Sequence, residues 1–125
     1  MYAHCPFHLV AEDEPDIRDL IMLTLQFNGY EVVTTGDGAE AVEEAQKADV
    51  DLILMDVRMP RMSGYEACRQ LREIDATKKV PIIFLSAKGQ ESEVQAGLDA
   101  GADYYVLKPF APDELSRKIK EVLGQ

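Results

Sequence analysis

Five short strand-like runs, most of them apolar, alternate with segments of helical spacing along the chain, and this alternation restricts the fold more than any other feature. The runs are Phe7–Ala11, Glu31–Thr35, Leu52–Met55, Ile82–Leu85 and Tyr104–Leu107. Short apolar runs bounded by polar breaks are typical of strands in parallel sheets, which are buried on both faces. The runs begin about 20 to 30 residues apart, the length of one βα unit. The pattern therefore predicts an α/β fold of the doubly wound (βα)5 type, with helices on both faces of a parallel sheet.

The segments between the runs carry apolar residues at helical intervals. This spacing is clearest in the first and the last segment, at Ile17, Leu20, Ile21, Thr24 and Asn28, and at Leu115, Ile119, Val122 and Leu123. Gly29 and Gly101 lie where the C-cap of a helix favours a left-handed residue. We therefore expect helices to end close to these two glycines.

Composition limits the class of protein. The chain has 125 residues, which suits one domain spanning residues 1–125, and 46% of them are hydrophobic and 29% charged, as in ordinary globular proteins. No apolar run approaches the ~20 residues of a membrane span, and the N-terminus lacks the pattern of a signal peptide, so we expect a cytoplasmic protein with no membrane contact. Cys5 and Cys68 are too few and too far apart for a disulfide scaffold. The net charge of −10 argues against direct binding to nucleic acid.

Residues with reactive or charged side chains follow four of the five predicted strands. In open parallel sheets, ligands bind beyond the carboxyl ends of the strands, where the strand order reverses. If the order is 2-1-3-4-5, then Glu12, Asp13 and Asp56 meet at one crevice, with Ser86 and Lys108 on its other side. Three carboxylates at one place favour raised pKa values or a hard cation, and Mg²⁺ fits best because it accepts carboxylate, water and phosphate oxygens. The set suits a phosphoryl group, with the central Asp56 as nucleophile.

Each of these residues also has a purely structural interpretation. The acidic segment around Asp13 could cap a helix, and Asp56 could begin a turn. Ser86 could be a cap, Lys108 a solvated lysine, and Tyr105 a packed strand residue. Their coincidence at four strand ends favours the functional interpretation.

His4, Cys5 and His8 lie close together in the sequence, but they lack a completing ligand at a metal-binding spacing. We therefore interpret them as residues of a solvated N-terminus and of the packed first strand.

Four motifs, taken in order, resemble the receiver domain of two-component response regulators. They are "VAEDEPDIRDLI", "DLILMDVRMPRMSGYE", "PIIFLSAKG" and "GADYYVLKPF", and together they span nearly the whole chain. The resemblance is to stand-alone, chemotaxis-type regulators, and it implies a flavodoxin-like three-layer sandwich with strand order 2-1-3-4-5. It also implies a signalling protein rather than an enzyme with an external substrate, one that catalyses its own Mg²⁺-dependent phosphorylation and dephosphorylation.

Residue by residue, the resemblance implies that Asp56 is the phosphoacceptor. The donor would be the phosphohistidine of a histidine kinase or of a phosphotransfer protein. Ser86 would donate a hydrogen bond to one phosphoryl oxygen, and Lys108 would pair with another. The implied ligands of Mg²⁺ are Glu12, Asp13, Asp56 and the backbone carbonyl of Arg58.

The resemblance further implies a conformational switch. Tyr105 matches the aromatic residue whose ring moves when Ser86 is drawn toward the phosphoryl group, and Pro109 matches a proline that follows a cis peptide bond. The segment "SAKGQESE" after the fourth strand is the expected two-state element. A downstream protein target would then contact the face formed by the fourth helix, the fifth strand and the fifth helix.

Two residues depart from the commoner family pattern. Glu12 stands where an aspartate is common and could reach the metal through water. Arg58 places a guanidinium near the site, where it could pair with Glu12 or the phosphoryl group, or obstruct hydrolytic water.

Other functions compete with this interpretation. A mononucleotide carrier would need a Ser/Thr/Gly-rich loop after the first strand, and a dehalogenase-like phosphatase would need its nucleophile there. The remaining alternative is a pseudo-receiver that only docks to proteins.

Overall fold

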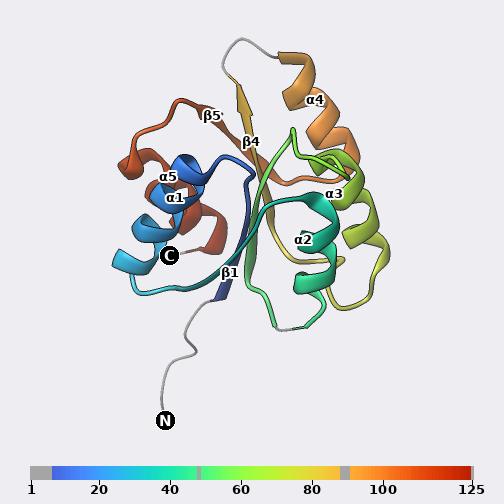
Figure 1. Cartoon of the computed structure of the whole chain (residues 1–125), viewed down its shortest axis with the longest axis horizontal. Coiled ribbons are helices and arrows are strands. Elements are labelled where there is room, and N and C mark those ends of the chain that lie inside the picture. Colours follow the sequence, from blue (N-terminus) through green and yellow to red (C-terminus); the bar gives the residue numbers. More distant parts are fainter. Residues whose placement is uncertain (1–6, 48, 88–90, 125) are drawn as a thin grey trace.

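The computed structural model describes residues 7–47, 49–87 and 91–124 (Figure 1). In chain order the elements are β1 (Phe7–Ala11), α1 (Pro15–Phe27), β2 (Glu31–Thr35), α2 (Gly38–Ala45), β3 (Leu52–Asp56), α3 (Gly64–Glu73), β4 (Ile82–Ala87), α4 (Glu91–Ala100), β5 (Tyr104–Lys108) and α5 (Pro112–Leu123). His4 and Cys5 lie outside the described residues.

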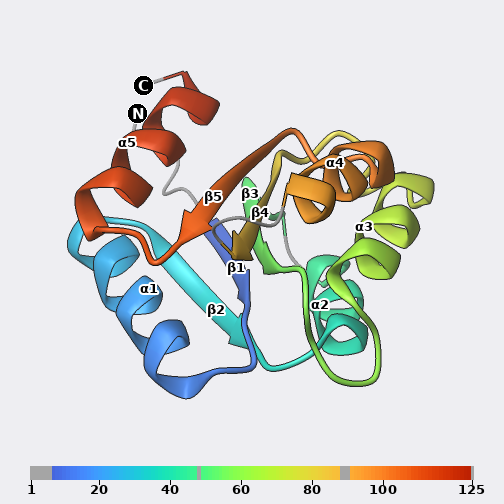
Figure 2. The ribbon, with the colours of Figure 1, turned by 90° about the horizontal axis from the view of Figure 1, so that it is seen from above.

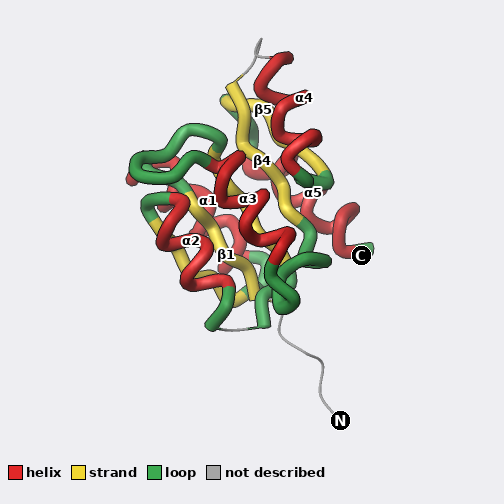
Figure 3. The backbone as a smooth tube through the Cα atoms, turned by 90° about the vertical axis from the view of Figure 1, so that its right-hand side faces the viewer, coloured by secondary structure: helices red, strands yellow, loops and turns green. Residues whose placement is uncertain are grey.

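The five strands form one parallel sheet in the order β2-β1-β3-β4-β5. Helices α1 and α5 cover one face, and α2, α3 and α4 cover the other, as the view along the sheet shows (Figure 2). Figure 3 shows the second face directly, with the three helices packed in front of the strands. The three-layer flavodoxin-like architecture and the strand order expected from the sequence are both confirmed. The order reverses between β1 and β3, so these two strands flank the switch point.

Three strands continue beyond their apolar runs. β3 ends at Asp56, β4 at Ala87 and β5 at Lys108, one or two residues later than the hydrophobic pattern predicts. Ladder hydrogen bonds join backbone groups, so a polar side chain does not by itself end a strand. In consequence Asp56, Ser86 and Lys108 are held within the sheet itself.

The end of α1 also differs slightly from the predicted helical spacing. The helix ends at Phe27, and Asn28 follows as its C-cap. Gly29 has φ +90° and Gly101 has φ +114°, the left-handed conformation that glycine adopts at little cost. Both glycines therefore end their helices as predicted.

The apolar core consists of two clusters, one on each face of the sheet. Successive residues of β3 point to opposite faces, so Leu52 and Leu54 join the cluster under α1 and α5. Ile53 and Met55 join the cluster under α2, α3 and α4. All five residues of β3 are buried, as expected for the central strand of a sheet covered on both sides. The phosphoacceptor candidate Asp56 is thus the last residue of a fully buried strand.

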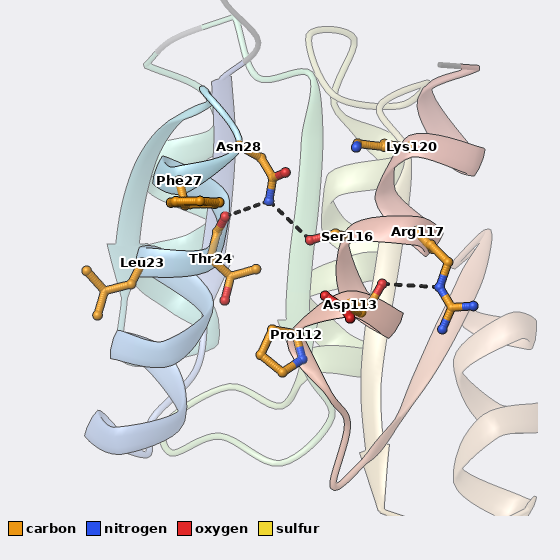
Figure 4. Close-up of a pocket in the computed structure, with 9 residues that line it drawn as sticks. All are labelled: Leu23, Thr24, Phe27, Asn28, Pro112, Asp113, Ser116, Arg117 and Lys120. Atoms are coloured by element: carbon orange, nitrogen blue, oxygen red, sulfur yellow. Dashed lines mark hydrogen bonds between the residues drawn. The ribbon is translucent and has the colours of Figure 1, made fainter.

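Helices α1 and α5 are joined at the end of α1. Asn28 Nδ2 donates to the Thr24 carbonyl at 2.8 Å and to Ser116 Oγ of α5 at 3.1 Å (Figure 4). The groove beside this bridge has a volume of about 830 Å³ and is bordered by Leu23 and Phe27 of α1. None of the helices among the described residues combines the length and the apolar character that crossing a bilayer requires.

Candidate functional site

The sequence-predicted residues lie at the carboxyl ends of neighbouring strands. Glu12 and Asp13 directly follow β1, and Asp56 is the last residue of β3. In the strand register, Asp56 lies opposite Leu85 of β4, and Ser86 lies opposite Leu107 of β5, one residue before Lys108. The parallel sheet therefore brings residues that are up to 96 positions apart, from Glu12 to Lys108, to one edge.

Three carboxylates converge at this edge. Glu12, Asp13 and Asp56 each offer an oxygen, and these oxygens lie within 4.8 Å of one another. Glu12 is fully buried and Asp56 is 6% exposed, whereas Asp13 faces solvent. Hard oxygen ligands with one solvent-facing member fit Mg²⁺, which keeps several waters when it binds to protein carboxylates.

Lys108 supplies the cation of the site. Its Nζ lies 2.9 Å from Asp56 Oδ2 and 3.0 Å from Glu12 Oε1. Burial alone would lower the pKa of Lys108, but hydrogen bonds and charges of Asp56 and Glu12 outweigh it and raise the pKa above its ordinary value. The ammonium therefore stays charged between the two carboxylates.

Glu12 is strongly perturbed in this cluster. Burial, reinforced by the neighbouring Asp56 carboxylate, raises the pKa of Glu12 to about 8, although Lys108 opposes the shift. Its Oε1 accepts no hydrogen bond of good geometry from the described residues, in spite of the nearby ammonium. A buried carboxylate beside two more carboxylates matches the ligand set of a hard cation.

The loop between β3 and α3 is fixed close to Asp56. The backbone N–H of Arg58 donates to Asp56 Oδ1 at 3.2 Å, so the Arg58 backbone lies next to the carboxylate cluster. Farther along, Arg61 pairs with Asp37, which caps α2 by accepting from the Glu40 N–H at 2.8 Å. This ion pair fastens the loop to the start of a neighbouring helix.

The Arg58 side chain does not lie where the sequence suggested. It pairs with Glu93 of α4, with Nη2 2.6 Å from Oε2. The possible pairing with Glu12 is therefore wrong, because Lys108 already occupies that carboxylate. Sequence reasoning missed Glu93, since an acidic residue in the first turn of a helix is common and carries no separate signal.

Ser86 and Tyr105 occupy different environments. Ser86 is buried, and its Oγ has no hydrogen-bond partner among the described residues. Tyr105 on β5 is 42% exposed. Within the expected two-state segment, residues 88–90 lie outside the described part of the chain. The peptide bond between Lys108 and Pro109 is cis, as the resemblance implied.

His8 takes no part in the site. It is fully buried on β1, and its ring centroid lies 4.3 Å from that of Tyr30. Its packing role agrees with the structural interpretation of this residue. Over the described ranges, the carboxylate cluster is the one group of potential metal ligands.

Comparison with known proteins agrees with this geometry. The family model described as "Response regulator receiver domain" matches residues 9–120. The alkaline phosphatase synthesis transcriptional regulatory protein PhoP of Bacillus subtilis is 41% identical over 115 residues, which are 92% of this chain and 47% of that protein. The response regulator MprA of Mycobacterium leprae is 44% identical over 115 residues, again 92% of this chain and 50% of that protein.

Solved structures are similar over almost the whole chain. The chemotaxis response regulator CheY4 of Vibrio cholerae has a TM-score of 0.91 and 38% identity, covering 96% of this chain and 100% of that one. The receiver domain of a sensor histidine kinase from Pseudomonas aeruginosa PAO1, which has a magnesium ion coordinated in its active-site cleft, has a TM-score of 0.90 and 35% identity. That match covers 98% of this chain and 100% of the other.

The chain spans about half the length of the curated relatives that it matches. The name of the first relative describes a transcriptional regulator, and this conflicts with the expectation of no direct nucleic-acid partner. The family match over residues 9–120 and the strand order agree. The chain belongs to the receiver domain family of response regulators.

Proposed function

We propose that Asp56 accepts a phosphoryl group from the phosphohistidine of a histidine kinase or a phosphotransfer protein. The observation that carries this proposal is the position of the Asp56 carboxylate, 2.9 Å from the Lys108 ammonium and inside a cluster of three carboxylates. An Asp56 oxygen attacks phosphorus, the bond from phosphorus to the histidine nitrogen breaks, and the imidazole leaves with the bonding electron pair and takes up a proton. The product is an acyl phosphate on Asp56.

Mg²⁺ is the cofactor that we propose for the transfer. The proposed ligands are Glu12, Asp13, Asp56 and the backbone carbonyl of Arg58. When bound, the ion supplies positive charge for the phosphoryl oxygens and orients them. The ion in the Pseudomonas aeruginosa receiver domain supports this proposal, as do the buried Glu12 carboxylate and the solvent-facing Asp13.

Lys108 and Ser86 are proposed to hold the phosphoryl group after transfer. Lys108 already contacts the Asp56 carboxylate, and Ser86 has a buried hydroxyl without a partner among the described residues. Hydrogen bonds to charged groups contribute about 1.5–3 kcal/mol each, and a nearly complete switch between two states requires about 5.5 kcal/mol. Two such bonds therefore reach the order of magnitude that a conformational switch needs.

The output is proposed to be a change in protein contacts at the face formed by α4, β5 and α5. Three large apolar residues of this face are partly exposed: Leu98 at 39%, Tyr104 at 38% and Tyr105 at 42%. Movement of the Tyr105 ring toward Ser86 would change the shape of the face. We propose a downstream protein as the partner of this surface.

The donor is proposed to contact the outer side of α1. Leu20, Leu23 and Phe27 are 42%, 60% and 92% exposed, and their spacing places them along one side of the helix. Leu20 also borders an apolar hollow of about 350 Å³ that Lys108 and Pro109 help to line. Through this hollow, Leu20 links the apolar ridge of α1, defined as Leu20, Leu23 and Phe27, to Lys108 of the proposed phosphorylation site.

The intact mass of the protein tests the proposed function. After incubation with Mg²⁺ and a small acyl phosphate, wild-type protein should gain one phosphoryl group. Asp56→Asn should gain none, and a chelator should prevent the gain in wild type. No gain under any condition would support the docking-only pseudo-receiver instead.

A further inference from the structure

The side chain of Arg58 connects the phosphorylation site with α4. Arg58 Nε donates to Glu93 Oε2 at 2.8 Å, and Nη2 lies 2.6 Å from the same oxygen. Glu93 is 8% exposed, and glutamates are rarely buried this far unless they are paired. The ion pair therefore satisfies a charge that would be costly to leave alone in this position.

Two further contacts link Arg58 to Asp56 and Glu93 to α3. The Arg58 backbone N–H donates to Asp56 Oδ1, so Arg58 contacts the carboxylate through its backbone and α4 through its side chain. The Tyr65 hydroxyl of α3 donates to the Glu93 carbonyl at 3.1 Å. The first turn of α4 is thus held by one charged and one neutral contact.

The Arg58 side chain is mostly exposed, whereas that of its partner is buried. The side chain of Arg58 is 77% exposed and that of Glu93 is 10% exposed. A phosphoryl group on Asp56 would add about −1.5 to −2 charges and three strong acceptor oxygens. A guanidinium binds such a group through two parallel hydrogen bonds, which a single carboxylate oxygen does not offer.

We propose that Glu93 is a positioning residue that holds the Arg58 guanidinium on α4 while Asp56 is unphosphorylated; this inference rests on the proposed function. On phosphorylation, the guanidinium exchanges Glu93 for the phosphoryl oxygens. Glu93 is then left buried and unpaired, so the first turn of α4 shifts to expose it to water. The exchange reports the state of Asp56 to α4 without requiring any movement of Ser86 or Tyr105.

Phosphoryl lifetime in a double-mutant cycle tests this exchange. Wild type, Glu93→Gln, Arg58→Ala and the double variant are phosphorylated with a small acyl phosphate, and loss of the phosphoryl group is followed by intact mass. Glu93→Gln should lengthen the lifetime several-fold, because the guanidinium is released to the phosphoryl oxygens. The double variant should have the lifetime of Arg58→Ala, because the effect of Glu93 passes through Arg58.

Amide hydrogen exchange of α4 provides the second measurement. In wild type, exchange in the first turn of α4 should rise on phosphorylation, and in Arg58→Ala it should be the same in both states. Glu91→Gln is the matched control, because it removes the same charge from the same turn at an exposed position, and it should keep the wild-type lifetime.

Failure of the inference and failure of the proposed function give different results. If wild type takes up no phosphoryl group, the proposed function is overturned. If wild type is phosphorylated but Glu93→Gln leaves the phosphoryl lifetime unchanged, only the proposed exchange is overturned, in which Arg58 leaves Glu93 for the phosphoryl oxygens. The same holds if Glu93→Gln changes the lifetime equally with and without Arg58.

Discussion

At the scale of single residues, Lys108 links two buried carboxylates of the candidate site. It is the cation shared by Glu12 and Asp56, and those two carboxylates are almost entirely buried. Burial of both groups is tolerated here because the ammonium lies between them and because the raised pKa of Glu12, about 8, keeps Glu12 protonated near neutral pH, so Glu12 adds no second negative charge.

We expect Lys108→Met to destabilise the protein. The substitution leaves buried carboxylate oxygens without their donor, which costs about 1–3 kcal/mol of unfolding free energy. Urea denaturation at neutral pH measures the loss. If Lys108→Met were as stable as wild type, the ammonium would not stabilise the cluster.

His8 should make stability depend on pH. Burial lowers the pKa of His8 below its ordinary value of 6.5, although a backbone hydrogen bond and the charge of Asp51 oppose the shift. The unfolded chain then binds more protons than the folded chain as the pH falls through 6.5, so the unfolding free energy decreases toward acid.

His8→Phe keeps a ring against Tyr30 but cannot titrate. Urea denaturation of both proteins over a pH series should show that the variant loses less stability on acidification than wild type does. Glu12 titrates in both proteins, so the difference between them isolates His8. Parallel pH profiles would contradict this account.

At the scale of elements, α4 approaches the sheet closely at one point. A Cβ on Gly97 would meet the ring of Phe84, which is buried on β4. We expect Gly97→Ala to cost about 1–3 kcal/mol from overpacking, more than the ~1 kcal/mol that alanine gains in helix propensity. Urea denaturation measures the net effect, and the cost should shrink in a Phe84→Leu background, where the ring is absent.

The apolar ridge of α1 should affect phosphoryl transfer from a donor protein but not from a small acyl phosphate. Phe27 is 92% exposed, so Phe27→Ser should change stability by less than about 0.5 kcal/mol. We expect slower transfer from the phosphorylated donor protein and an unchanged rate from a small acyl phosphate. Leu98→Ser on α4 is the matched control, and equal slowing by both substitutions would exclude a specific role for the ridge.

Elements also show where sequence reasoning succeeds and where it stops. Alternating apolar runs were enough to predict the strands, because burial on both faces leaves a clear pattern in Leu52–Met55 and Ile82–Leu85. The contact between Arg58 and Glu93 was not predictable, because it depends on the rotation of α4 against the β3–α3 loop. No local pattern encodes that rotation.

At the scale of the whole molecule, part of the site can likewise be predicted from the sequence and part cannot. Glu12, Asp13 and Asp56 could be brought together from sequence because carboxyl ends of parallel strands share one edge. The strand order that makes them neighbours came from the family resemblance, since periodicity alone does not order strands. The position of Lys108 between Glu12 and Asp56 required the structure, because a lysine side chain can reach in many directions.

The two apolar clusters lie on opposite faces of the sheet, and each has its own set of buried side chains. Changes in side-chain volume in one cluster should therefore add to changes in the other, because the residues share no partners. The apolar ridge of α1 lies over one cluster, and Glu93 with its helix lies over the other. Natural variation can thus repack the layer beneath α1 and α5 while the packing under α4 stays as it is, so the two sides of the sheet can diverge separately between lineages.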